Sequence, residues 1–242
     1  MNPSRLASFL RSPFDASVAA LEPIVTGERS ARDGLLLGAA VIVCWYLYVP
    51  VHELLHAAGC ALSGGSVTTL EIQHQYGGGL LAELFPFVRA GGEYAGRLSD
   101  FDTHGSDLVY LATDALPFSL SLLGVPLLRS ARRGVRPLRA GAGFVLGLAP
   151  FYNIPGDYFE MGSILVTMPL AGHWQALRSD DLFRLAGQLA SDPAGLGLEA
   201  VSPMASVALV ALSGLLAVGL AYSTWGLSWL LAQPLGAGRA EA

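Results

Sequence analysis

Charge is scarce in this sequence, and lysine does not occur in it. Only 14% of the 242 residues are charged, whereas an ordinary soluble domain carries about 25%. All 14 cationic residues are arginine, which we interpret as a compositional bias and not as chemistry. The formal net charge of −5 provides no basic face for phosphate groups. These features argue against a soluble globular enzyme and against a nucleic-acid partner.

Cysteine is also rare, since the chain contains only Cys44 and Cys60, both in apolar surroundings. A disulfide framework is therefore not expected, and each thiol is predicted to be a small buried side chain. Hydrophobic residues, by contrast, make up 52% of the chain, and the mean hydropathy is +0.50. Intrinsic disorder requires the opposite composition. An integral membrane protein is the class that remains.

Four long apolar segments predict an α-helical, multi-pass membrane protein with about four transmembrane spans. They cover residues 34–62, 107–128, 138–170 and 204–231. The third segment is interrupted by prolines and several polar residues, which predicts two half-helices joined by irregular backbone. All four belong to a single membrane-embedded domain at 34–232, which we expect in a bacterial cytoplasmic membrane.

The other segments are more polar. Residues 1–33 mix arginine with acidic residues and are expected to form a cytosolic or interfacial N-terminal segment, while 233–242 form a C-terminal tail. The Gly-rich segment 63–106 contains alternating apolar and polar positions over 70–76, which predicts a short strand or hairpin. Residues 171–202 place apolar side chains among charged ones, a pattern that favours an interfacial amphipathic helix.

The first predicted span contains the sequence HELLH, whose polar members are His52, Glu53 and His56. Positions four apart share a face of a helix, so both imidazoles can bind one Zn²⁺. Glu53 is then placed to accept a proton from metal-bound water. Three ionisable side chains inside a membrane helix are costly unless they have a function. The alternative is a pair of structural histidines that bond backbone carbonyls or a carboxylate, which leaves Glu53 unexplained.

A catalytic zinc site usually has three protein ligands, and the broken third span offers Asp157 and Glu160 as the third. These residues are three apart and would share a face of a half-helix that begins near Gly156. One could bind the metal while the other orients a histidine or a substrate, or either could cap the half-helix. Asp114, in the second span, is either a partner of a zinc-bound histidine or a helix-packing group.

This order of motifs resembles the site-2 protease family of intramembrane zinc metalloproteases. HELLH in the first span, a Gly-rich β-like segment, a second span and a third span broken by an Asn-Pro-acid motif carry the resemblance over residues 34–170. In that family the third span has the pattern NxxPxxxxDG, whose Asp is the third zinc ligand. The sequence here, FYNIPGDYFEMGSIL, departs from the pattern. Alignment on Pro155 places Glu160 at the position of the family's third ligand, whereas residue type favours Asp157. We prefer Asp157 as the third ligand.

The resemblance implies that His52 and His56 bind zinc, that Glu53 is the general base, and that Asn153 lies near the substrate or the transition-state oxyanion. We therefore predict a zinc metalloendopeptidase that hydrolyses membrane protein or peptide substrates within the lipid bilayer, with Glu53 activating a zinc-bound water. The predicted strand at 70–76 could hold an unwound substrate by accepting it as an added strand.

Two other interpretations stay open. One is a non-catalytic zinc-binding membrane scaffold, and the other is a membrane zinc peptidase of another class in which Glu160 is the third ligand.

His52 lies 18 residues after Gly34. At about 1.5 Å per residue this places the metal toward the leaflet far from the N-terminus. The distribution of arginine favours an N-terminus inside the cell, whereas the resemblance implies a metal near the cytosol.

Overall fold

The computed structural model describes residues 3–26, 30–132, 136–170, 172–192, 195–198 and 202–233, and most of them are helical. The predicted C-terminal tail, except Gln233, lies outside the described residues. The α-helices are α1 (Pro3–Val25), α2 (Ala31–Ser63), α3 (Gly78–Leu84), α4 (Asp107–Ala115), α5 (Gly124–Arg132), α6 (Pro137–Tyr152), α7 (Asp157–Thr167), α8 (Leu182–Ser191) and α9 (Pro203–Leu231). Three 3₁₀ segments, η1 (His74–Tyr76), η2 (Leu116–Leu123) and η3 (Gly172–Leu177), and three strands, β1 (Ser66–Ile72), β2 (Val88–Ala90) and β3 (Gly96–Asp102), complete the fold.

Three helical stretches are long and apolar enough to cross a membrane: α2, the continuous stretch Asp107–Arg132 formed by α4, η2 and α5, and α9. They match the predicted spans at 34–62, 107–128 and 204–231. The predicted third span is divided into α6 and α7, of 16 and 11 residues, which are separated at residues 153–156. The predicted break is therefore confirmed, while a fourth span stays a prediction.

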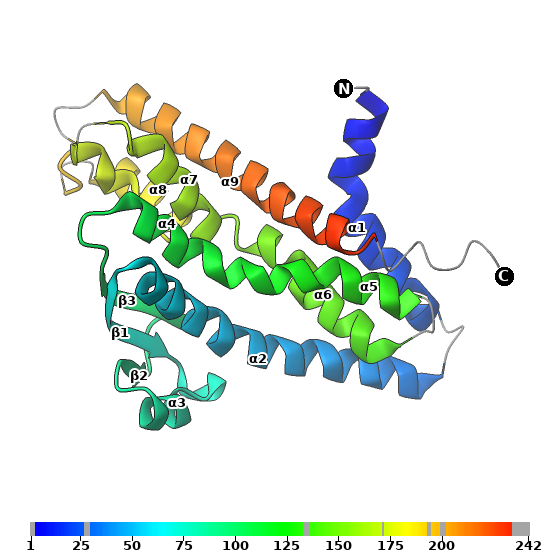
Figure 1. Ribbon diagram of the computed structural model, residues 1–242. Helices are drawn as coiled ribbons and strands as arrows, with labels where there is room; N and C mark the ends of the chain where they lie inside the picture. The colour runs from blue at the N-terminus through cyan, green and yellow to red at the C-terminus, as the bar shows by residue number, and fades with distance from the viewer. Residues whose placement is uncertain are drawn as a thin grey trace.

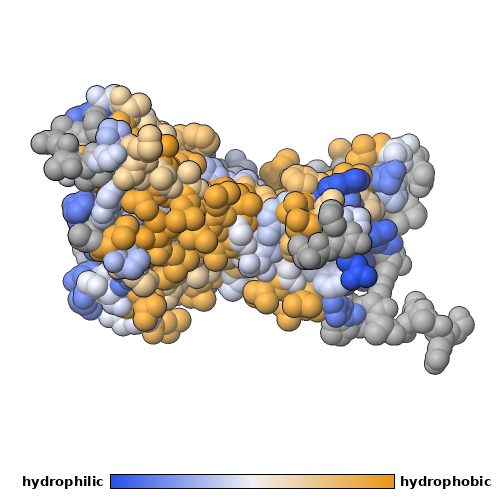
Figure 2. Space-filling model, turned by 90° about the horizontal axis from the view of Figure 1, so that it is seen from above, coloured by the Kyte–Doolittle hydropathy of each residue, from blue (hydrophilic) through white to orange (hydrophobic). Residues whose placement is uncertain are grey.

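The outer surface of the long helices is strongly apolar. Within the most hydrophobic windows of α2 and α9, only 17% and 22% of the residues are buried inside the protein. Leu35, Leu47 and Leu215 are among the side chains that are more than 60% exposed. Figure 2 shows hydrophobic residues covering much of one face, with hydrophilic residues toward its ends. Such a surface fits a lipid environment, because water would solvate it poorly.

The helices form one bundle in which α4, η2 and α5 run between α2 and α9 (Figure 1). Helix α6 packs on α2 and α5, and α7 packs on α9. The N-terminal segment, predicted to be cytosolic or interfacial, contributes α1. Two hydrogen bonds connect α1 to α9, one from the Tyr222 hydroxyl to the Leu10 carbonyl (2.8 Å) and one from the Trp225 indole to the Ser12 hydroxyl (2.9 Å). Helix α1 is thus docked on the bundle.

The predicted β-structure of the Gly-rich segment is present, and it extends beyond a strand or hairpin to a three-stranded sheet with the order β2-β1-β3. Strand β1 pairs in parallel with β2 and antiparallel with β3, so it is central and both of its edges are occupied. The buried side chains of Leu70 and Ile72 pack with Ala57 of α2, which anchors the sheet beside the C-terminal half of that helix (Figure 1).

The predicted strand at 70–76 is wrong at its C-terminal end. Strand β1 ends at Ile72, and the next residues form the 3₁₀ turn η1. Gly77 follows with a φ of 83°, a left-handed conformation that reverses the chain and that glycine adopts without steric cost. The predicted amphipathic helix at 171–202 is present as η3 and α8 within the described residues of that range.

Candidate metal centre

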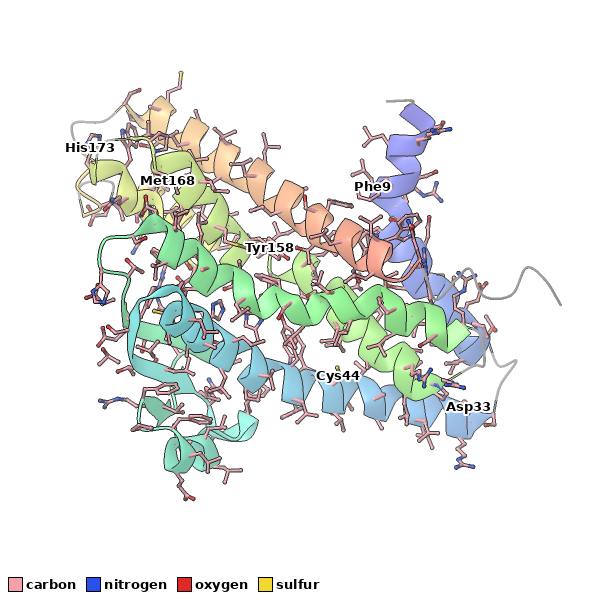
Figure 3. All side chains as sticks on the ribbon, in the orientation of Figure 1. Phe9, Asp33, Cys44, Tyr158, Met168 and His173 are labelled. Atoms are coloured by element: carbon pink, nitrogen blue, oxygen red, sulfur yellow. The ribbon has the colours of Figure 1, made fainter. Side chains whose placement is uncertain are left out.

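The two histidines of HELLH lie one turn apart on the inner face of α2. His52 and His56 are 5% and 6% exposed, respectively. Asp33 marks the far end of α2 in Figure 3, so the histidines lie in the half of the helix nearer the sheet. Helix α7 begins at Asp157 next to Tyr158, which lies in the interior of the bundle (Figure 3). The break between α6 and α7 therefore delivers a carboxylate to the depth of the histidines.

His52, His56 and Asp157 converge on one point, with one ligand atom each within 4.8 Å of the others. The His52 Nε2 atom is 2.9 Å from Asp157 Oδ2 and 3.1 Å from His56 Nε2, and the distance from His56 Nε2 to Asp157 Oδ2 is 3.6 Å. Ligand atoms at about 2.0–2.1 Å from a tetrahedral zinc ion lie about 3.3 Å from one another. The three spacings bracket that value, so these residues could hold a metal ion, and their donor set is one that zinc uses.

A backbone carbonyl fixes which nitrogen of His56 faces the cluster. The Nδ1 atom of His56 lies 3.0 Å from the Thr113 carbonyl oxygen. A carbonyl only accepts, so Nδ1 carries a proton and Nε2 is the ring atom that faces His52 and Asp157 and is available to a metal ion. The α-helical donor to the Thr113 carbonyl would be the amide of residue 117, and Pro117 has no N–H. The sequence of α4 and η2 thus leaves this carbonyl available to orient a metal ligand.

Close packing of α2 on α4 brings His56 to Thr113. A Cβ atom added at Gly59 would lie 2.6 Å from the Ala112 carbonyl oxygen. Only glycine allows the two backbones to approach this closely, as small residues do at helix crossings in membranes. One turn from Gly59, His56 therefore faces the carbonyl that it bonds.

Asp157 and Glu160 have different surroundings, although both lie in the first turn of α7. The structure places Asp157 beside the two imidazoles and brings Glu160 to Tyr110 of α4, whose hydroxyl donates to Glu160 Oε1 at 2.6 Å. Within the part of the chain that the structure describes, Glu160 is outside the group of converging ligand atoms. This geometry favours Asp157 as the third ligand.

Glu53 and Asn153 line the same cavity as the histidines. Glu53 is half-buried, and its side chain occupies the space beside Gly96 of β3, where an added Cβ would lie 2.3 Å from Glu53 Cγ. The Asn153 amide nitrogen donates to the Tyr48 hydroxyl (3.2 Å) and to the Ala149 carbonyl (3.0 Å). Asn153 therefore holds Tyr48, a residue that the motif analysis missed although it lies one turn before His52.

The cavity has a volume of about 1030 Å³ and lies between the bundle and the sheet. Its walls come from α2, β3, α4, the break between α6 and α7, and the segment around η3 and α8. Two ion pairs include cavity-lining residues: Arg97 of β3 contacts Asp180 at 2.9 Å, and Arg178 makes a bidentate pair with Asp107 at 2.6 and 3.0 Å. The first pair connects the sheet to the segment before α8.

Asp181, next to the cavity-lining Asp180, caps the N-terminus of α8. The backbone N–H of Arg184 donates to Asp181 Oδ1 at 2.9 Å and the Tyr94 hydroxyl donates to Oδ2 at 3.2 Å. These bonds, the backbone one foremost, hold the pKa of Asp181 below its ordinary value because they stabilise the charged carboxylate.

Two buried polar atoms near the centre have no hydrogen-bond partner among the described residues. They are Nδ1 of His52 and Oδ2 of Asp114. Asp114 is 3% exposed and lines the cavity. Among the described residues, it forms no hydrogen bond or ion pair with a histidine. The suggested partnership between Asp114 and a zinc-bound histidine is therefore absent from this geometry, in which the Thr113 carbonyl takes that position for His56.

No protein-family model matches the chain, and neither a curated protein nor a solved structure matches it.

Proposed function

We propose that this protein is an intramembrane zinc metalloprotease that cleaves peptide bonds of membrane-embedded substrates. The observation that carries the proposal is the convergence of His52, His56 and Asp157 at zinc-ligand spacing, with Glu53 next to the first histidine and an open cavity beside them. A general base that lines the same cavity as three ligand atoms fits hydrolysis better than metal storage.

A bound Zn²⁺ would polarise the scissile carbonyl and lower the pKa of a water toward about 7. In this proposal His52, His56 and Asp157 hold the ion. Glu53 accepts the proton of the attacking water and later delivers it to the leaving amine. Gly96 leaves room for the Glu53 side chain on the cavity side of β3. Burial of the histidines excludes competing solvent from their ring nitrogens.

Strand β3 is the better candidate for binding an unwound substrate. From the sequence we expect this role for residues 70–76, but residues 70–72 are paired with β2 on one side and with β3 on the other, and residues 74–76 form the turn η1. Strand β3 lies at the edge of the sheet, and residues 96–99 of it line the cavity. A substrate segment that adds to this edge would expose its carbonyls next to Glu53, which a hydrogen-bonded helix cannot do.

We further propose that α6 and α7 together form a fourth span, and that the protein is a multi-pass component of a bacterial cytoplasmic membrane. At about 1.5 Å per residue the two helices are about 24 and 16 Å long, which together exceed the hydrocarbon thickness. The irregular backbone between them is surrounded by protein and by the polar cavity, as such a break at membrane depth requires.

The proposal is tested with purified protein in proteoliposomes that contain single-span peptides with a fluorophore and a quencher. We expect Glu53→Gln to keep the wild-type zinc content and to lose cleavage, because the ligands remain and the proton acceptor is gone. Glu83→Gln, an exposed position in α3, is the matched control and should cleave normally. Zinc binding without any cleavage by the wild type would support the non-catalytic scaffold instead.

A further inference from the structure

A second group of polar side chains lines the cavity beyond the candidate metal centre. Tyr110 and Asp114 lie one turn apart on α4, and the Tyr110 hydroxyl donates to Glu160 of α7 at 2.6 Å. All three residues line the cavity. Asp114 is 97% buried, and its Oδ2 atom has no hydrogen-bond partner in the described chain. A buried carboxylate oxygen that faces a cavity without a partner requires a ligand or a proton.

The cations around this cavity are already paired with other carboxylates. Arg178 is bound to Asp107 through both of its terminal nitrogens, and Arg97 and Arg184 both contact Asp180. Within the described residues, no ion pair includes Asp114 or Glu160. Besides Glu53, the cavity therefore contains two acidic side chains, Asp114 and Glu160, that make no ion pair within the described chain.

We propose that Asp114 and Glu160 form a subsite that binds a cationic side chain, lysine or arginine, of the substrate next to the scissile bond. This inference rests on the proposed function and specifies its substrate class. An ammonium or guanidinium group would supply donors to the free Asp114 oxygen and to Glu160. Tyr110 holds one Glu160 oxygen and so fixes the orientation of that carboxylate. Attraction between opposite charges is strong there because the site is shielded from bulk water.

An organic cation fits this subsite better than a second metal ion. Metal binding requires several ligand atoms at one point, and among the described residues only His52, His56 and Asp157 converge in this way. Asp114 and Glu160 come from different helices, and Tyr110, one turn before Asp114, contacts Glu160. A long cationic side chain can reach both, because its donors lie at the end of a flexible stem. Substrates with a lone basic residue in or near their apolar segment are therefore the expected class.

The test uses a fluorescent single-span peptide in which arginine is moved one position at a time along the region around the cleavage site. Each peptide is compared with a version containing citrulline, which has the same shape without the charge. Cleavage rates are measured with zinc-loaded protein in proteoliposomes, and dissociation constants are measured with Glu53→Gln, which should bind without cleaving. At one position we expect arginine to be preferred over citrulline by about 10- to 100-fold, the range for charge-assisted hydrogen bonds.

The variants Asp114→Asn and Glu160→Gln preserve side-chain shape and should each reduce this preference toward unity. Asp15→Asn, on the exposed face of α1, is the matched control and should keep it. The comparison of arginine with citrulline on the wild type needs no variant, so a folding defect cannot hide the answer.

Equal rates and affinities for every arginine and citrulline pair, with cleavage that still depends on Glu53, would overturn the subsite and leave the proposed function intact. A second zinc or manganese ion per chain that is lost in Asp114→Asn would also overturn it, because the subsite would then bind metal. Arginine-selective binding without cleavage would support the subsite and contradict the proposed protease activity.

Discussion

Replacement of Gly96 by alanine should disable Glu53 without removing the metal ligands. The added Cβ would lie 2.3 Å from Glu53 Cγ, whereas ordinary contacts of a Cβ begin at 3.4 Å. The two groups must therefore separate by about 1 Å, and a misplacement of that size can reduce a rate about 100-fold. The backbone of Gly96 does not have a positive φ, so alanine adds a steric effect without backbone strain.

The assay measures peptide cleavage and zinc content of the same Gly96→Ala preparation. We expect a full zinc content with kcat lowered about 100-fold. Gly38→Ala is the control, because an added Cβ there meets nothing within 4 Å. It should keep both zinc and activity. If kcat is unchanged in Gly96→Ala, Glu53 does not accept the proton from the position that it has in the structure.

Two further predictions concern the ion pair between Arg178 and Asp107 and the carboxylate of Asp181. Arg178→Gln should lower the free energy of unfolding by about 3 kcal/mol, the lower end of the range for broken buried pairs, because the side chains of Arg178 and Asp107 are 9% and 24% exposed. Thermal or denaturant unfolding in detergent measures this free energy. Arg11→Gln is the control and should change the free energy of unfolding little, because its ion pair is exposed. Equal effects of both variants would contradict the prediction. Asp181 has a folded-state pKa below its unfolded value, so its stabilisation is present above about pH 4 and is lost as the pH falls through the folded pKa. The unfolding midpoint of wild type should exceed that of Asp181→Asn at pH 6, with a difference that shrinks below pH 4, and a constant difference would exclude this linkage.

The long apolar runs made most of the fold predictable. Three of the four predicted spans correspond to helices of the required length, and the prolines and polar residues after Tyr152 mark the break before α7. The extent of the strand at 70–76 was not predictable from alternation alone. The strand ends at Ile72 because the next residues form the 3₁₀ turn η1, which Gly77 caps, and the neighbours of β1 come from residues 88–102.

The metal centre was predictable only in part. The spacing of His52 and His56 depends on one helix and can be read locally, but Asp157 lies 105 residues after His52. The motif alignment favoured Glu160 while residue type favoured Asp157, which we preferred, and the packing of α7 against α4 separates the two acids. The role of the Thr113 carbonyl could have been inferred from Pro117 four residues later, since the proline removes the helical donor.

The most direct test of the central claim is the zinc content of detergent-purified protein, measured by elemental analysis under chelator-free conditions. Wild type should contain about one zinc ion per chain, as a site with three protein ligands requires. His56→Ala and Asp157→Ala should lose it, and Glu160→Ala should keep it. Loss of zinc in Glu160→Ala but not in Asp157→Ala, or folded wild-type protein without zinc, would contradict the centre formed by His52, His56 and Asp157.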